Sequence, residues 1–256
     1  MPNYHFGTGY LWGTPLTDAT NTTITTPTPV MFGEIQDVSI DISFDAKELY
    51  GQVQFPLAIR RGKGKIAGKA KFARLNGLLL NSLFFGQTTS ASSVLAFADT
   101  VGALIPSTPF QITPTVPGSG TWSADLGVKD SNGNPMTAVA SGPTTGQYSV
   151  ATGIYTFAVA DVGKTVFISY RYTATSTASK TSIVTNQIMG STPTFRADFV
   201  NGSTANANGF TSLSLFSCVT NKFTFQPKLD DFGMDELDFV AQQDSVGRVL
   251  QWGTSE

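Results

Sequence analysis

Charge, histidine and cysteine are scarce in this chain of 256 residues. It has one histidine, one cysteine and 13% charged residues, whereas an average soluble domain carries about 25% charged residues. A lone cysteine, Cys218, excludes an internal disulfide and a cysteine-based zinc site, and we expect it to be a buried, inert thiol. The only histidine, His5, has no predicted regular structure around it, although a Ser-His-Asp triad needs a rigidly held histidine. We therefore expect a protein that is not an enzyme and has no catalytic residues.

The acidic and glycine-rich stretches lack the patterns that hold metals or nucleotides. The carboxylates near 230–238 do not have the alternating ligands and closing Glu of a twelve-residue calcium loop. The glycines that begin at Gly62 do not form a GxxxxGK[ST] phosphate loop. Their spacing instead indicates a strand that is crowded by a neighbour. We expect no metal and no cofactor.

Long hydrophobic runs are also missing. The longest apolar stretches, 78–80 and 83–85, are far shorter than the roughly 20 residues of a membrane span. The N-terminal Met-Pro-Asn-Tyr-His has no basic segment leading into an apolar run, so we expect a soluble product that is not exported. Sixteen basic and 18 acidic residues give a net charge of -2, which provides no global field for nucleic acid or anionic lipid.

Short alternating segments separated by turn clusters dominate what is present. Strand patterns occur at 37–45, 63–73, 110–116, 121–129, 147–150, 154–158, 164–173, 182–189, 194–200, 211–216 and 220–225. The only helical spacing is that of Leu75, Leu78, Leu79 and Leu83, with Gly86 placed as a C-terminal stop. The sequence therefore predicts a mainly β protein, a β-sandwich or barrel with one short α-helix at about 75–85 and long loops.

The chain divides into an arm, a core and a middle segment. Residues 1–30 show neither helical nor strand periodicity, and we expect an extended N-terminal arm that orders only when something packs on it. Residues 31–102 and 176–256 are assigned to the core. The β-rich segment 103–175 is a candidate inserted subdomain. The connection 46–61 is long enough to be a loop or an extended hairpin tip.

Two predicted strands carry opposite charges. In 37–45, apolar side chains alternate with acidic and hydroxyl side chains, so one face of this strand is acidic. In 63–73, lysines share one face, and seven of the 16 basic residues fall between positions 60 and 74. The candidates for a subunit interface or a lumen are Asp41, Asp45, Lys63, Lys65, Lys69 and Lys71.

The lysine row has three interpretations. In the first, it pairs with the acidic strand or with an acidic surface of a neighbouring copy, and each ion pair contributes roughly 0.2 to 1 kcal/mol. In the second, it contacts the phosphates of DNA. In the third, it is a solvated face. In each case lysines on a strand also limit uncontrolled edge pairing.

The order of several motifs is familiar. An acidic alternating strand is followed by Lys-Glu-Leu-Tyr-Gly, Phe-Pro-Leu-Ala, Gly-Lys-Gly-Lys, Leu-Asn-Gly and Leu-Phe-Phe-Gly. Later pieces are Thr-Asn-Gln-Ile-Met-Gly, Pro-Thr-Phe-Arg-Ala-Asp-Phe, Cys-Val-Thr-Asn-Lys-Phe-Thr-Phe and Lys-Leu-Asp-Asp-Phe. In this order the chain resembles the major tail, or tail tube, proteins of long-tailed bacteriophages over 32–88 and 180–252. The middle segment is similar to a β element that recurs in phage structural proteins.

The resemblance implies a structural virion protein with a tail-tube-like fold. Its copies would form homo-oligomeric rings, usually of six, whose strands join into a β-barrel lumen and which stack along the tail. The implied partners are the tail-tip, tape-measure and tail-terminator proteins. Genomic DNA would pass through the lumen during ejection without specific binding, and no membrane insertion is involved. The implied location is the virion, after assembly in the host cytoplasm.

A lumen that passes DNA should not retain phosphate, because unpaired lysines in every ring would add salt-dependent contacts. We therefore predict that Lys63, Lys65, Lys69 and Lys71 are mostly neutralised by carboxylates such as Asp41 and Asp45. Two other functions remain open. One is a head decoration or minor tail protein. The other is a module that binds host-surface carbohydrate through exposed aromatic residues such as Trp122 and Tyr148.

Overall fold

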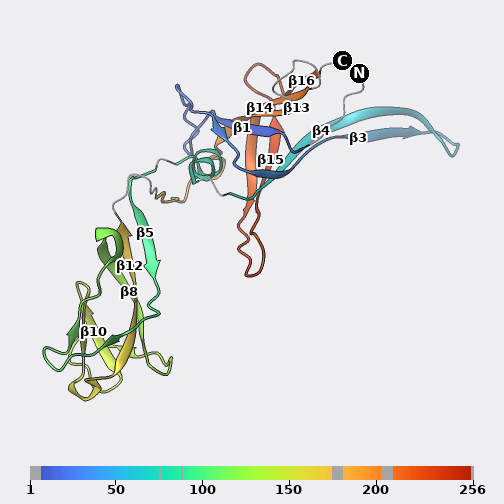
Figure 1. Cartoon of the computed structure of the whole chain (residues 1–256). Coiled ribbons are helices and arrows are strands. Elements are labelled where there is room, and N and C mark those ends of the chain that lie inside the picture. The colour runs from blue at the N-terminus through green and yellow to red at the C-terminus, as the bar shows by residue number, and fades with distance from the viewer. Residues whose placement is uncertain (1–6, 75–76, 88, 175–180, 203–209, 255–256) are drawn as a thin grey trace. The chain divides into compact units, whose positions relative to one another are not determined.

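The computed structural model describes residues 7–74, 77–87, 89–174, 181–202 and 210–254. The chain forms two compact units (Figure 1). Unit 1 comprises Met1–Thr88 and Ser182–Glu256, and unit 2 comprises Thr89–Thr181. Strands account for 53% and helices for 6% of the described residues. The expected mainly β, sandwich-like fold with a single short helix is therefore confirmed.

Unit 1 is built on one large sheet. Its strands are β1 (Tyr10–Pro15), β2 (Val30–Met31), β3 (Ile35–Tyr50), β4 (Pro56–Phe72), β13 (Thr194–Gly202), β14 (Phe210–Thr224), β15 (Asp235–Gln242) and β16 (Leu250–Thr254). They are ordered β2-β1-β13-β14-β15-β4-β3, and β16 pairs with β14. β15 and β16 pair with successive parts of β14, as Val219 lies opposite Val240 and Leu215 opposite Leu250. They therefore follow one another along the same side of β14.

One face of this sheet and the helix enclose the core of unit 1. Phe32 packs edge-on against Phe72, and Phe195 against Phe239, with ring centroids 6.4 and 5.7 Å apart. These rings are fully buried, as is Leu83 of the helix. A Cβ added at Gly13 would lie 2.2 Å from Leu83 Cδ1. The missing side chain at Gly13 therefore lets the helix lie directly on β1.

The helix differs in detail from the expected one. It begins as α1 (Gly77–Leu79) and continues as the π-helix η1 (Leu80–Phe85), ending at Gly86 with φ 60°. Leu79 and Leu83 are buried, but Leu78 is exposed, which corrects its assignment to the buried face. Two turns of helix present only a narrow stripe to the sheet, and the i→i+5 hydrogen bonds of η1 shift which positions face it. Leu75 lies outside the described residues.

Three other expectations about unit 1 need correction. Residues 10–15 of the expected N-terminal arm form β1, a paired strand of the sheet. Gly13 and Pro15 occupy its buried positions, so the apolar alternation that marks a strand is absent from the sequence. Residues 182–189, predicted as a strand, form none. The stretches 211–216 and 220–225 belong to a single strand, β14, with a bulge near Thr220.

Unit 2 has a separate core between two small sheets. Its strands are β5 (Ser93–Phe97), β6 (Ala103–Leu104), β7 (Gln111–Ile112), β8 (Thr121–Asp130), β9 (Thr137–Ala138), β10 (Gln147–Ala151), β11 (Ile154–Phe157) and β12 (Thr165–Ala174). Two 3₁₀ turns, η2 (Pro117–Ser119) and η3 (Val159–Asp161), complete it. Since β5 pairs with β12, the unit begins before position 103, where the sequence placed its start.

A half-buried carboxylate links the two sheets of unit 2. Asp125 of β8 accepts hydrogen bonds from the hydroxyls of Tyr148 and Tyr155, at 2.5 and 3.0 Å, and both tyrosines come from the opposite sheet. The indole N–H of Trp122 donates to the Tyr155 hydroxyl at 3.3 Å. Burial raises the pKa of both tyrosines, which keeps their hydroxyls available as donors. This network ties the two sheets together.

Gly68 offers a test of packing in the large sheet. A Cβ at Gly68 would lie 2.1 Å from the buried Phe239 ring, so Gly68→Ala should lower the free energy of unfolding by about 1 to 3 kcal/mol. Gly64→Ala in the same strand is the control, because it meets only the half-exposed Phe44 ring, and it should change stability by less than about 0.5 kcal/mol. Urea denaturation measures both. Equal losses would contradict the packing described for Phe239.

Candidate functional site

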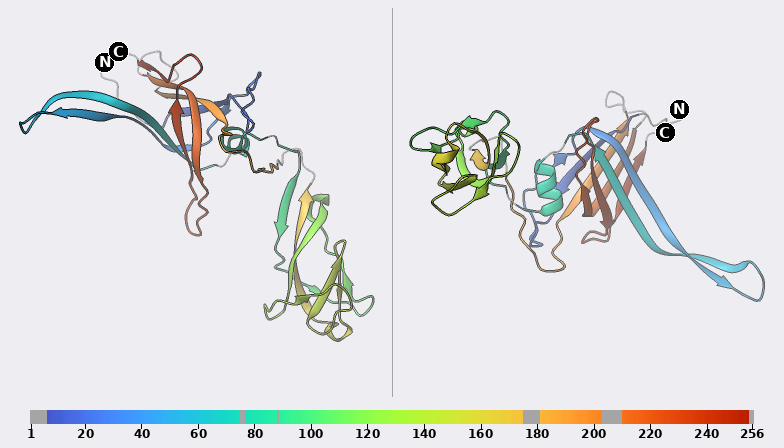
Figure 2. Two further views of the ribbon diagram at one scale, coloured as in Figure 1. Left: turned by 180° about the vertical axis from the view of Figure 1, so that it is seen from behind. Right: turned by 90° about the horizontal axis from the view of Figure 1, so that it is seen from below.

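The hairpin of β3 and β4 is longer than the sheet that carries it. β15 pairs with β4 only from Phe72 back to Ile66. Beyond that point β3 and β4 continue as a two-stranded ribbon (Figure 2), and its residues are exposed or half-exposed. We call residues 41–65 the arm. Only 51–55 separate the two strands, so the connection that the sequence left open is an extended hairpin.

The arm is regular but interrupted by bulges. Its register shifts between Phe44 and Ala46 and again between Leu49 and Tyr50. Two residues of β4, Gly62 and Lys63, lie opposite the single residue Asp45 at the first shift. A bulge increases the local twist and bends the strand. The arm therefore turns away from the sheet at a defined place.

Large apolar side chains are exposed along the arm. A two-stranded ribbon alone is marginally stable in water, and exposed apolar edge strands favour pairing with other chains. The exposed fraction reaches 80% at Phe55. The others, each more than half exposed, are Leu49, Tyr50, Val53, Leu57, Ile59 and Phe44. This surface is typical of a segment that is covered in an assembly.

The two oppositely charged strands do pair, and a third charged strand joins them. Lys69 lies opposite Asp238 of β15 on one side and Ser39 of β3 on the other. The Lys69 ammonium is 2.6 Å from a Glu236 carboxylate oxygen of β15. Lys71 Nζ is 3.7 Å from Asp37 Oδ2 of β3. Lysines thus lie between two acidic strands.

The predicted neutralisation holds for half of the lysine row and with other partners. Lys69 and Lys71 are paired, but by Glu236 and Asp37 and not by Asp41 or Asp45. The register explains this, because Asp41 faces Ala67 and Asp45 falls at the first bulge. Lys63 and Lys65 lie beyond the end of β15. Among the described residues, no carboxylate lies within 4.0 Å of either ammonium group.

The arm therefore carries an excess of positive charge. Five cations and three carboxylates lie within 41–65, so its net charge is 5 − 3 = +2. Lys47 and Arg60 are directly opposite each other, an arrangement that is destabilising in a sheet. The Arg61 guanidinium lies 4.9 Å from the centre of the Phe44 ring. In the isolated chain these cations have few compensating contacts.

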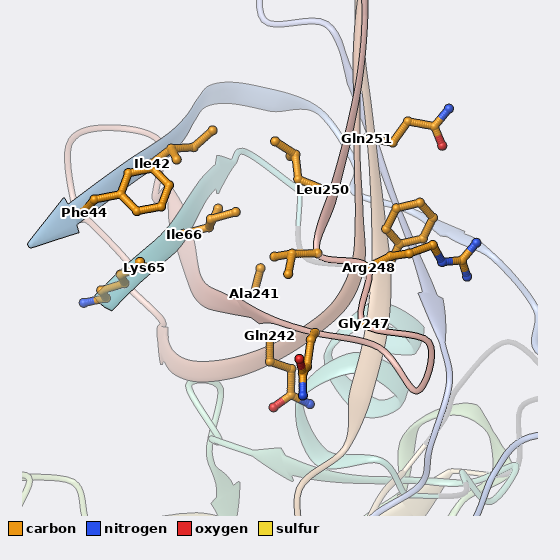
Figure 3. A pocket seen from close by; sticks show the side chains of 14 residues that line it. Ile42, Phe44, Lys65, Ile66, Ala241, Gln242, Gly247, Arg248, Leu250 and Gln251 are labelled. Carbon is orange, nitrogen blue, oxygen red and sulfur yellow. The ribbon is translucent and has the colours of Figure 1, made fainter. Parts of the chain in front are cut away.

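An apolar groove lies where the arm leaves the sheet. β4 diverges there from the line of β15 and β16, leaving a groove of about 890 Å³. Ile42, Phe44 and Ile66 of the hairpin line one side, and Ala241 and Leu250 line the other (Figure 3). Lys65 also borders the groove, but its side chain is directed to the opposite face of β4 from that of Ile66. Arg248, also in the lining, is paired with Asp244 at 2.8 Å.

The other residues considered from the sequence lie apart from this groove. Cys218 is buried, as expected, and desolvation raises the pKa of its thiol to about 12. Asp230 and Asp231 lie in the loop before β15, whereas Asp235, Glu236 and Asp238 lie within it. Within the described part of the chain, no three His, Cys, Asp or Glu side chains converge as metal ligands. His5 lies outside the described residues.

The aromatic residues proposed for carbohydrate binding are not an exposed pair. Tyr148 is only 2% exposed, and its hydroxyl is engaged by Asp125. Trp122 is half-buried and donates to Tyr155. These side chains hold the core of unit 2 together. This corrects their assignment as exposed contacts for a glycan.

The chain matches no model of a protein family and no curated protein. Among the described residues, no helix is long and apolar enough to cross a membrane. The geometry of the arm, the charge rows and the groove is therefore the basis for functional inference.

The Lys69–Glu236 ion pair predicts a dependence of stability on pH. The hydrogen bond from Lys69 lowers the pKa of Glu236, and the same bond raises the pKa of Lys69. A carboxyl with a lowered folded pKa stabilises above its unfolded pKa, and this contribution is lost as pH falls through the folded pKa. Glu236→Gln should therefore reduce the free energy of unfolding at neutral pH and have little effect at about pH 2, where carboxyl groups are protonated.

Urea denaturation at the two pH values measures this effect. Asp41→Asn is the matched control, since Asp41 lies in the adjoining β3 and has no cation within 4.0 Å among the described residues. It should leave stability at neutral pH unchanged. An equal loss in both variants, or a loss in Glu236→Gln that persists in acid, would contradict the ion pair.

Proposed function

We propose that this chain is a structural virion protein, the major tail tube subunit of a long-tailed phage. Its copies assemble into stacked rings that form the DNA-conducting channel of the tail. The observation that carries the proposal is the arm, a long ribbon with exposed apolar side chains that unit 1 leaves without a partner. Such a ribbon is stabilised when neighbouring copies cover it.

The extent of the resemblance supports this proposal. The similar segments, 32–88 and 180–252, fall within unit 1 except for positions 180 and 181, and the intervening part of the chain forms the separate unit 2. The acidic and lysine-rich motifs lie on β3 and β4, two of the later motifs lie on β13 and β14, and Lys-Leu-Asp-Asp-Phe lies in the loop that precedes β15. The two segments that carry the resemblance are far apart in the sequence, but their strands belong to one sheet. Unit 2 is then an insertion into a tube subunit.

The charge distribution fits a channel that passes DNA without retaining it. Lys69 and Lys71 on the sheet are paired with carboxylates, which reduces their attraction for phosphate. The two lysines of the row that have no ion pair among the described residues, Lys63 and Lys65, are on the arm, which is the segment proposed to contact other subunits. In this proposal, tail-tip, tape-measure and tail-terminator proteins meet the tube, and the virion is the site of action.

Self-assembly can be observed directly. Negative-stain electron microscopy of the concentrated protein should show rings or tubes with a central channel. Unit 2, as an insertion, should appear as additional density on each subunit. Particles that remain monomeric at every concentration would contradict the proposed self-assembly and favour a head decoration or minor tail protein.

Shortening the arm should separate folding from assembly. Replacing 45–63 with Asn-Gly joins Phe44 to Gly64 by a two-residue turn suited to a hairpin. The deleted residues are almost all exposed, so the thermal midpoint and the circular dichroism spectrum should stay close to those of the full chain. Sedimentation velocity should show loss of the higher oligomers. A shortened chain that assembles normally would contradict the role of the arm.

A further inference from the structure

The apolar core face of β3 and β4 continues into the groove, where none of the described residues covers it. Ile40 is packed against the core, whereas the next two residues of the same face, Ile42 and Phe44, are 43% and 51% exposed. Leu250 lines the far wall of the groove. The arm that begins at the groove has a net charge of 5 − 3 = +2. The groove therefore suits a ligand with bulky apolar side chains and a carboxylate.

The loop between β14 and β15 has this chemistry. Leu229 is 97% exposed and Phe232 is 83% exposed. Asp230 lies between them without a cation within 4.0 Å among the described residues, while Asp231 is paired with Lys228 at 3.1 Å. The absence of a Cβ at Gly233 lets the backbone pass close to the Gln226 carbonyl. We call residues 225–234 the acidic-apolar loop.

The loop and the groove lie at opposite ends of one strand. The loop precedes Asp235, the first residue of β15, and the groove is lined by Ala241 and Gln242 at its other end. Eight residues at roughly 3.3 Å each place these ends about 26 Å apart. Figure 1 shows the loop extending beyond β14 and β15, away from β16. The loop of one copy therefore does not reach the groove of the same copy.

We propose that the acidic-apolar loop of one copy docks in the groove at the base of the arm of a second copy. Leu229 and Phe232 enter between Ile42, Phe44 and Leu250, and the carboxylates of the loop lie beside the positively charged arm. Each copy then has one donor end and one acceptor end, and such a head-to-tail contact repeats from copy to copy. This inference rests on the proposed self-assembly and specifies one of its contacts.

Cross-linking tests which surfaces meet. The variant Leu229→Cys/Phe44→Cys places one thiol on the loop and one at the groove of each chain, and a short bismaleimide reagent joins thiols that come close. The native Cys218 does not compete, because it is buried and its thiol pKa is raised. We expect a ladder of cross-linked dimers and higher species. Ile188→Cys/Phe44→Cys is the control, since Ile188 is 86% exposed but outside the loop, and it should give monomers.

Charge placed on the loop tests the energetics of the contact. Leu229→Asp/Phe232→Asp should raise the apparent dissociation constant in sedimentation velocity about tenfold or more, as expected for central apolar anchors. The matched control is Ile188→Asp/Met189→Asp, which alters two equally exposed apolar residues of unit 1. The control should assemble as the unmodified chain does. Circular dichroism should show that both variants are folded.

The outcomes separate this inference from the proposed function. Tubes in the microscope, with no loop-to-groove ladder and normal assembly of the Leu229→Asp/Phe232→Asp variant, would overturn the docking contact alone. A ladder without rings or tubes would support the contact and contradict the tail tube. Neither a ladder nor an assembly at any concentration would overturn both.

Discussion

The structure of unit 1 depends on the pairing of β4 with two strands of different length. β15 supports β4 from Ile66 to Phe72, while β3 pairs with it along almost its whole course. Core packing stops where β15 ends. From there β16 takes the place of β15 beside β14, and β4 does not pair with β16. Beyond this point the hairpin is a two-stranded ribbon, and no layer formed by the described residues covers it. The arm, the groove and the unpaired lysines all follow from this divergence.

The same divergence divides the charges. Lysines that lie beside β15 meet carboxylates from both neighbouring strands, whereas those farther out meet none among the described residues. Exposed pairs of this kind contribute little to stability individually. Their arrangement is more informative about association, since charge that is unpaired in one copy is available to another. The proposed tube and the proposed loop-to-groove contact both use this available surface.

Sequence periodicity predicted the parts of the fold in which one face is buried and the other is polar. β8 and β12 were located to within one residue, whereas 37–45 and 63–73 cover only the parts of β3 and β4 that lie nearest the sheet. The pairing of the acidic and lysine strands was anticipated. β1 was missed because Gly13 and Pro15 occupy buried positions, and the partner of Lys69 was missed because Glu236 joins the sheet from a distant part of the chain. The groove depends on where β4 leaves β15, and no local pattern specifies that position.

Hydrogen–deuterium exchange of the arm tests most directly whether other copies complete it. In dilute protein, a two-stranded ribbon without a covering layer opens readily, so amides in 45–61 should exchange much faster than those of β14. In concentrated, assembled protein the same amides should become protected while β14 is unchanged. Fast exchange of the arm under both conditions would contradict the account, because it would show that assembly leaves the ribbon uncovered.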